Sequence, residues 1–152
     1  MPEKETIERA HEDAREGKSS STQAGEFVRE EMHHIRGGKH GAASTKQAIA
    51  IGLSKALRAG VKLTPPRKGK ASASTTKKAA QDYRKGQSHS RGQTSSRRSQ
   101  ATSNALKKKG RSAASHESLS RQARTSARNR GSASRRNAAK RGSRTRAHTK
   151  AA

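Results

Sequence analysis

The last 88 residues of this chain are too poor in apolar side chains to build a hydrophobic core. Residues 65–152 contain three large apolar residues, Tyr83, Leu106 and Leu119, against 25 Lys/Arg and two acidic residues. With so little surface to bury and a net charge of +23, such a segment cannot offset the entropy that folding costs. We therefore expect residues 64–152 to be a basic, disordered, low-complexity tail.

Helix-forming stretches nevertheless recur in this tail between glycines. They cover residues 74–86, 100–110, 115–131 and 132–142. Their spacing is irregular, which is typical of low complexity rather than of a solenoid repeat. We expect transient helices that become ordered when phosphate groups neutralise their charge.

The chain before residue 64 differs in charge and in pattern. Residues 1–35 hold nine acidic and five basic residues, and the early glutamates with Gly17 as a stop predict a helix within residues 2–17. The two prolines of "TPPRKGK", residues 64–70, prevent a helix from continuing. We divide the chain into an acidic helical head (1–22), a helical hairpin (23–63) and the basic tail (64–152).

The hairpin is predicted from two apolar stripes at helical spacing. Residues 23–36 and 44–59 each follow a capping-box pattern and end at glycine. The fold class expected is mostly α and largely disordered, with short N-terminal helices and an αα-hairpin. Because the apolar face is small, the hairpin is marginal alone, and a homodimer through this face would stabilise it. The face consists of Val28, Met32, Ile35, Ile49, Leu53 and Leu57.

A cationic tail of this kind is expected to bind a polyanion, and nucleic acid first of all. Each phosphate that it neutralises releases counterions, which makes binding strong at low salt and independent of base sequence. The scarcity of aromatic residues disfavours stacking on single strands, so duplex DNA is preferred over RNA. The candidate phosphate contacts are Arg97, Arg98, Lys107, Lys108, Lys109, Arg111, Arg121, Arg124, Arg128, Arg130, Arg135, Arg136, Lys140, Arg141, Arg144 and Arg146.

Other functions are compatible with the same composition. The chain fits a disordered stress-protective or scaffold protein, and also a ribosome- or RNA-associated basic protein. A helix-turn-helix is disfavoured because the loop at residues 37–43 is longer than that motif uses. We expect a histone-like accessory protein of the cytoplasm, associated with the nucleoid.

The sequence predicts neither an enzyme nor a cofactor or small-molecule site. No nucleophile elbow, phosphate-binding glycine motif or membrane-length apolar run is present. His33, His34 and His40, with Glu30 nearby, raise the possibility of a metal site, but the chain has no cysteine thiolate to complete one. We expect exposed histidines and no bound metal.

The segment "GKHGAASTKQAIAIGLSKALRAGVKL" resembles a family of small, basic bacterial proteins of unknown function. The shared positions are Gly38, His40, Gly41, Lys46, Gln47, Ala48, Ile49, Ala50, Ile51, Leu53, Ser54, Ala56, Arg58, Ala59 and Gly60. The chain departs from the pattern at Gly52, where alanine is usual, at Lys55, where glutamate is usual, and in its long tail. The resemblance implies a bacterial source and no particular activity. The tail also looks like bacterial histone-like tails.

Overall fold

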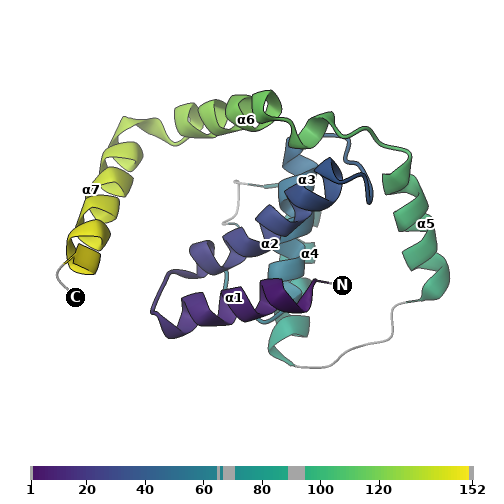
Figure 1. The fold of residues 1–152 in the computed structure, drawn as a ribbon, viewed down its shortest axis with the longest axis horizontal. Coiled ribbons are helices and arrows are strands. Elements are labelled where there is room, and N and C mark those ends of the chain that lie inside the picture. Colours follow the sequence, from purple (N-terminus) through teal and green to yellow (C-terminus); the bar gives the residue numbers. More distant parts are fainter. Residues whose placement is uncertain (1, 65, 67–70, 89–94, 151–152) are drawn as a thin grey trace. The chain divides into compact units, whose positions relative to one another are not determined.

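A computed structural model describes residues 2–64, 66, 71–88 and 95–150, and within these ranges every regular element is a helix (Figure 1). The chain forms two compact units, Met1–Ser115 and His116–Ala152. Most of the segment at residues 64–70, which we expected as a boundary, lies outside the described residues. The helices are α1 (Lys4–Arg15), α2 (Ser20–Arg36), α3 (Thr45–Arg58), α4 (Ala73–Gln87), α5 (Ser96–Lys107), the 3-10 turn η1 (Ser112–Ala114), α6 (His116–Asn129) and α7 (Gly131–Lys150).

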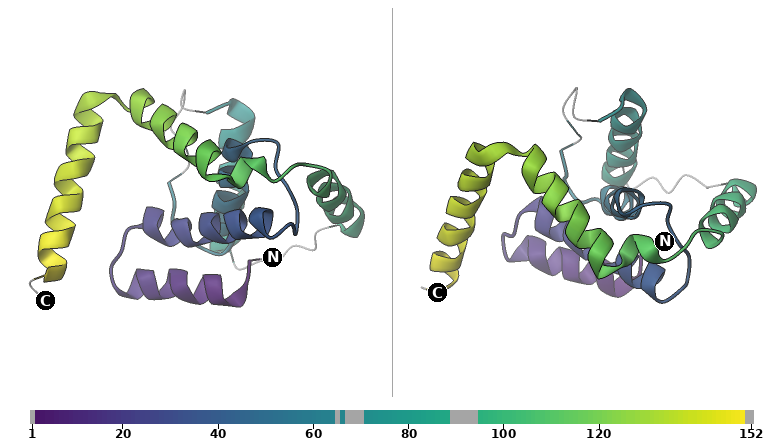
Figure 2. Two further views of the ribbon diagram at one scale, coloured as in Figure 1. Left: turned by 45° about the horizontal axis from the view of Figure 1, so that its top comes forward. Right: turned by 90° about the horizontal axis from the view of Figure 1, so that it is seen from above.

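The first two helices pack side by side and run in opposite directions (Figure 2). Gly17 takes a left-handed φ of 73° in the tight connection between them. The side chain of Ser19 then caps α2 by accepting a hydrogen bond from the backbone of Thr22. With Ser19 as the cap, α2 begins at Ser20, three residues before the start that the sequence predicts.

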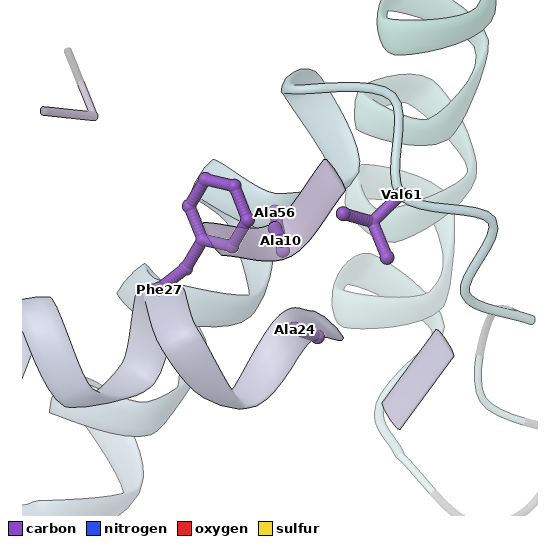
Figure 3. Packing of buried hydrophobic residues seen from close by; sticks show 5 residues of the cluster. All are labelled: Ala10, Ala24, Phe27, Ala56 and Val61. Carbon is purple, nitrogen blue, oxygen red and sulfur yellow. The ribbon is translucent and has the colours of Figure 1, made fainter. Parts of the chain in front are cut away.

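The apolar core of the first unit is built around Phe27 of α2. This ring is fully buried and packs with Ala10 of α1, Ala24 of α2, Ala56 of α3 and the following Val61 (Figure 3). The hairpin face predicted from the sequence does not include Phe27, whereas the structure places this ring at the centre of the cluster. In this cluster one large ring is surrounded by small side chains.

Small residues also line the contact between α2 and α3. The buried residues of α3 include Ala48, Gly52 and Ala56, which follow one another at four-residue spacing. A Cβ atom on Gly52 would lie 2.7 Å from the Cα atom of Val28. The two backbones approach so closely that a bulky residue cannot stand between them.

This close approach changes the expected hairpin face. Met32, Ile35 and Leu57 are buried, and Val28 and Ile49 are half-buried. Leu53 is 37% exposed, although the periodicity placed it on the inner side of α3 with Ile49. The pattern selected three large apolar residues that are buried, but on α3 small residues occupy buried positions that it did not select. A homodimer through this face stays a prediction.

The end of α3 follows the sequence prediction. Gly60 takes a φ of 95°, and the backbone N–H groups of Gly60 and Val61 donate to the carbonyls of Leu57 and Ala56. Val61 then folds back and is buried. At the other end of α3, the Ser44 side chain accepts from the backbone N–H of Gln47 at 3.2 Å.

Part of the expected tail packs on this helical core. α4 lies against α3, and a Cβ atom on Gly86 would lie 1.9 Å from the carbonyl oxygen of Leu57. Asp82 of α4 accepts from Arg58 at 2.8 Å and from Ser54 at 2.7 Å. The contact includes a glycine and a buried carboxylate, and a count of apolar side chains gives no weight to either.

The turn η1 also packs on α2 and α3. Arg36 donates to the carbonyl of Ala114 at 2.9 Å, and Thr45 donates to the carbonyl of Ala113 at 2.7 Å. Both alanines are buried. The first unit thus includes residues up to 115, well into the segment that the sequence assigns to the tail.

The second unit consists of α6 and α7, joined at Arg130 with Gly131 at a φ of 71°. Among its side chains whose burial is described, none is buried. Within the described part of the chain, no helix combines the length and the apolar character that crossing a membrane requires.

Candidate functional site

All sixteen basic residues that the sequence nominates as phosphate contacts have exposed side chains. They lie on α5 and in the segment after it, on α6 and on α7. In the first unit these are Arg97, Arg98, Lys107, Lys108, Lys109 and Arg111. In the second unit they are Arg121, Arg124, Arg128, Arg130, Arg135, Arg136, Lys140, Arg141, Arg144 and Arg146.

The two acidic residues of this basic region are both engaged. Asp82 is buried and pairs with Arg58 of α3, so its negative charge neutralises a cation outside the sixteen candidates. Glu117 pairs with Arg121 one turn later on α6. Because residues 65–152 contain no other carboxylate side chain, the remaining cations have little compensating charge within this region.

Three of the cations gather around a hollow in the first unit. Lys107, Lys109 and Arg111 line it together with Gly38, His40 and Gly110. The Arg111 side chain also lies 3.5 Å from the carbonyl oxygen of Arg36. We call this group the basic hollow, and it brings three of the candidate residues together around one cavity.

Backbone contacts between two distant segments form the basic hollow. The N–H groups of Gly41 and Ala42 donate to the carbonyls of Leu106 and Gly110, at 3.0 and 3.2 Å. A Cβ atom on Gly41 would lie 2.0 Å from the carbonyl oxygen of Lys109, so only glycine fits there. The contact joins segments more than 60 residues apart, and no periodic pattern in the sequence predicts it.

A second polar site lies inside the helical core. Glu30 and Glu31 of α2 are 4% and 0% exposed. The ammonium of Lys55 on α3 lies 2.9 Å from an oxygen of each carboxylate. Burial opposes the charge of Lys55, but its contacts with Glu31 and Glu30 outweigh burial and raise its pKa. Burial likewise opposes ionisation of Glu30, yet the hydrogen bonds from Lys55 and the Glu3 backbone hold its pKa below the ordinary value.

Histidines surround these carboxylates. His34 lies 2.9 Å from Glu3 and 3.8 Å from Glu30, and Lys39 donates to the same Glu3 oxygen at 2.8 Å. These hydrogen bonds, from Lys39 first and then from His34, lower the pKa of the Glu3 carboxyl to about 2. His40 lies 3.4 Å from Glu31, and His33 is exposed. The structure therefore separates His33 from the other two histidines.

The sequence argument overlooked Glu31 and Lys55 as parts of a site. A signal for Glu31 does exist, because it stands four residues after Phe27 and four before Ile35, on the apolar side of α2. A carboxylate at such a position needs a buried partner. Lys55 shows no comparable signal, because its position on α3 also suits an exposed cation.

The comparisons with known proteins bear on the segment of the first unit that contains α2 and α3. Neither a curated protein nor a solved structure matches the chain. Residues 15–68 match the model of a family described as a family of unknown function (DUF6496). The match takes in α2, α3 and the polar site between them, about a third of the chain, and ends at residue 68, at the start of the basic region.

Proposed function

We propose that this protein binds nucleic acid, duplex DNA above all, through the phosphate backbone and without preference for base sequence. One observation carries the proposal: sixteen basic side chains are exposed in a region whose only two carboxylate side chains are already engaged. A surface with such an excess of cations gains free energy by replacing the counterions of a polyanion. In a bacterial cell this activity corresponds to a histone-like accessory protein of the nucleoid.

The arrangement of the cations favours backbone contacts over base reading. Single α-helices carry most of them, and in the second unit no described side chain is buried to fix the helices in one orientation. Direct reading of base edges requires side chains held in a fixed geometry. We propose that α6 and α7 adapt to the duplex and gain their order from the phosphates.

Duplex DNA is preferred to single strands because stacking platforms are missing from the basic region. Tyr83 is its one aromatic residue among Phe, Tyr and Trp, and the ring is half-buried on α4. Proteins that hold single strands stack successive bases on exposed aromatic side chains. The proposed activity is binding without catalysis.

Fluorescence anisotropy on two unrelated DNA duplexes of equal length, over a salt series, tests the proposal. We expect equal affinities and a slope of log K against log salt steeper than about −5, which corresponds to about six phosphates neutralised. An RNA duplex and a single strand serve as competitors and are expected to bind more weakly. A slope near zero, or a clear preference for one duplex, contradicts the proposal.

The basic hollow allows a sharper test, in which two variants lose the same number of positive charges at different places. Replacing Lys107, Lys109 and Arg111 with glutamine removes three cations that surround one cavity. Replacing Lys77, Lys78 and Arg84 of α4 removes three exposed cations elsewhere and is the matched control. Because a phosphate bound in the hollow contacts several cations at once, we expect the first variant to lose more affinity than the control. Equal losses would remove the hollow from the proposed interface.

A further inference from the structure

We propose that Glu31, His34 and His40 bind a divalent transition-metal ion, with zinc as the preferred ion. One potential ligand atom from each residue lies within 4.8 Å of the other two. This site shares His40 with the basic hollow, but it does not depend on nucleic-acid binding. It also departs from the expectation that the sequence supports, in which these histidines are merely exposed.

The Glu31 carboxylate provides the first line of argument. It is fully buried, and neither of its oxygens accepts a hydrogen bond from the described residues. The Lys55 ammonium pairs with Oε2 at 2.9 Å and leaves Oε1 without a hydrogen bond. Oε1 instead faces Nε2 of His40 at 3.4 Å. A buried carboxylate with unfilled lone pairs is costly, and a cation at Oε1 would remove that cost.

The geometry around Oε1 fits a metal ion. In tetrahedral zinc sites the ligand distances of about 2.0–2.1 Å place neighbouring ligand atoms about 3.3 Å apart. The 3.4 Å between Glu31 Oε1 and His40 Nε2 matches this separation. The His34 and His40 rings lie edge to face, with their centres 6.1 Å apart. A small movement of the His34 side chain completes a three-residue site.

The contacts of the two histidines fix which nitrogen is free to bind. His40 Nδ1 lies 3.2 Å from the carbonyl oxygen of Gly41, and His34 Nε2 lies 2.9 Å from Glu3 Oε1. Each oxygen accepts a hydrogen bond from the N–H at that position, which leaves a lone pair on His40 Nε2 and on His34 Nδ1. Metal-binding histidines in proteins are held by the same kind of second hydrogen bond.

The chemistry of the donors selects the metal. Two imidazole nitrogens with one carboxylate oxygen suit zinc and related transition metals better than calcium or magnesium, which prefer oxygen ligands. The His34 and His40 side chains are 12% and 18% exposed, so water can reach the remaining coordination position. A bound ion would tie α2 to the loop that carries His40, and this loop also lines the basic hollow.

Zinc titration of the full chain, metal-free and without a histidine tag, tests the proposal near neutral pH. Competition with a chromophoric chelator measures the affinity, and cobalt(II) spectra report the coordination. We expect one tight equivalent of zinc and a loss of affinity of at least tenfold in His34→Gln and in His40→Gln. His33→Gln is the matched control, because it removes the neighbouring exposed histidine, and its affinity is expected to be unchanged. Absence of zinc binding, or equal losses in all three variants, would overturn the site.

A second measurement does not depend on the variants keeping their fold. Zinc added to the unsubstituted chain should shift the imidazole NMR signals of His34 and His40 and leave those of His11 and His33 in place. Shifts at the other histidines alone would overturn the site. Since neither experiment contains nucleic acid, its result is independent of the proposed DNA binding.

Discussion

At the residue scale, two glycines on neighbouring helices have opposite roles. Gly52 of α3 faces the backbone of α2, where an added Cβ would meet the Cα atom of Val28 at 2.7 Å. Gly25 of α2 is exposed, and an added Cβ there would meet nothing within 4 Å. A glycine inside a helix normally lowers stability relative to alanine. At position 52 the close packing of the two helices nevertheless requires glycine.

Substituting each glycine with alanine separates packing from propensity. We expect Gly52→Ala to lower the free energy of unfolding by about 1–3 kcal/mol, because the added methyl group forces the two helices apart. Gly25→Ala should raise it by about 0.5–1 kcal/mol through helix propensity alone. Urea unfolding followed by circular dichroism measures both values. Stabilisation by both substitutions would show that α2 and α3 are not in this close contact.

Lys55 is the second residue whose role can be tested alone. Its ammonium compensates two carboxylates that are 4% and 0% exposed. Removing one partner of a buried ion pair leaves uncompensated charge in the interior. We expect Lys55→Met to lower the free energy of unfolding by about 3 kcal/mol, whereas Lys46→Met, at an exposed position of the same helix, should change it little. Equal effects of the two substitutions in urea unfolding contradict this role.

The same residues predict how stability depends on pH. The pKa of Glu30 is lowered from 4.5, so its stabilising contribution is present above that value and is lost as pH falls through its folded pKa. The pKa of Lys55 is raised from 10.5, so its contribution is present below that value and is lost as pH rises through its folded pKa. Urea unfolding over a pH series should show a broad maximum between these limits, and the acid side should flatten in Lys55→Met.

At the scale of elements, the positions of the helices could be predicted from the sequence, but their packing could not. Capping serines and glycine stops mark the ends of α2 and α3 to within a few residues. Four helix-forming stretches of the basic region correspond to α4, α5, α6 and α7. These signals are local, because each depends on residues within one or two turns of a helix end.

The sequence did not predict those contacts between helices that involve few apolar atoms. The buried residues of α3 include Ala48, Gly52 and Ala56, while the larger Leu53 is 37% exposed. The basic hollow depends on Gly41 beside the backbone of Lys109. An apolar count gives such glycines no weight, yet they decide which backbones can meet. The exposed cations of the candidate site, by contrast, follow directly from charge.

The docking of α4 can be tested at Gly86. An added Cβ there would lie 1.9 Å from the carbonyl oxygen of Leu57, whereas one on Gly142 of α7 would meet only the Arg146 side chain, at 3.5 Å. We expect Gly86→Ala to release α4, so that hydrogen exchange of residues 73–87 becomes as fast as in an isolated helix. Residues 20–58 should stay protected, and Gly142→Ala should change neither segment. Unaltered protection of α4 in Gly86→Ala contradicts the docking.

At the scale of the whole molecule, stability and charge belong to different parts of the chain. Every buried residue among those described lies before residue 116. Residues 116–152 hold eleven of the 36 Lys/Arg and one of the eleven acidic residues. The second unit therefore contributes charge without contributing to a core.

This separation predicts the behaviour of a chain that ends at Ser115. Its thermal midpoint should equal that of the full chain, because the truncation removes no residue that is described as buried. Its salt slope for duplex DNA should become shallower by about 0.9 for each phosphate that residues 116–152 neutralise in the full chain. A full-length chain with residues 116–152 scrambled is the matched control, and it should keep the original slope because composition and charge are unchanged. If scrambling weakens binding as much as truncation does, the second unit contacts DNA through a defined structure, and binding is more than phosphate neutralisation.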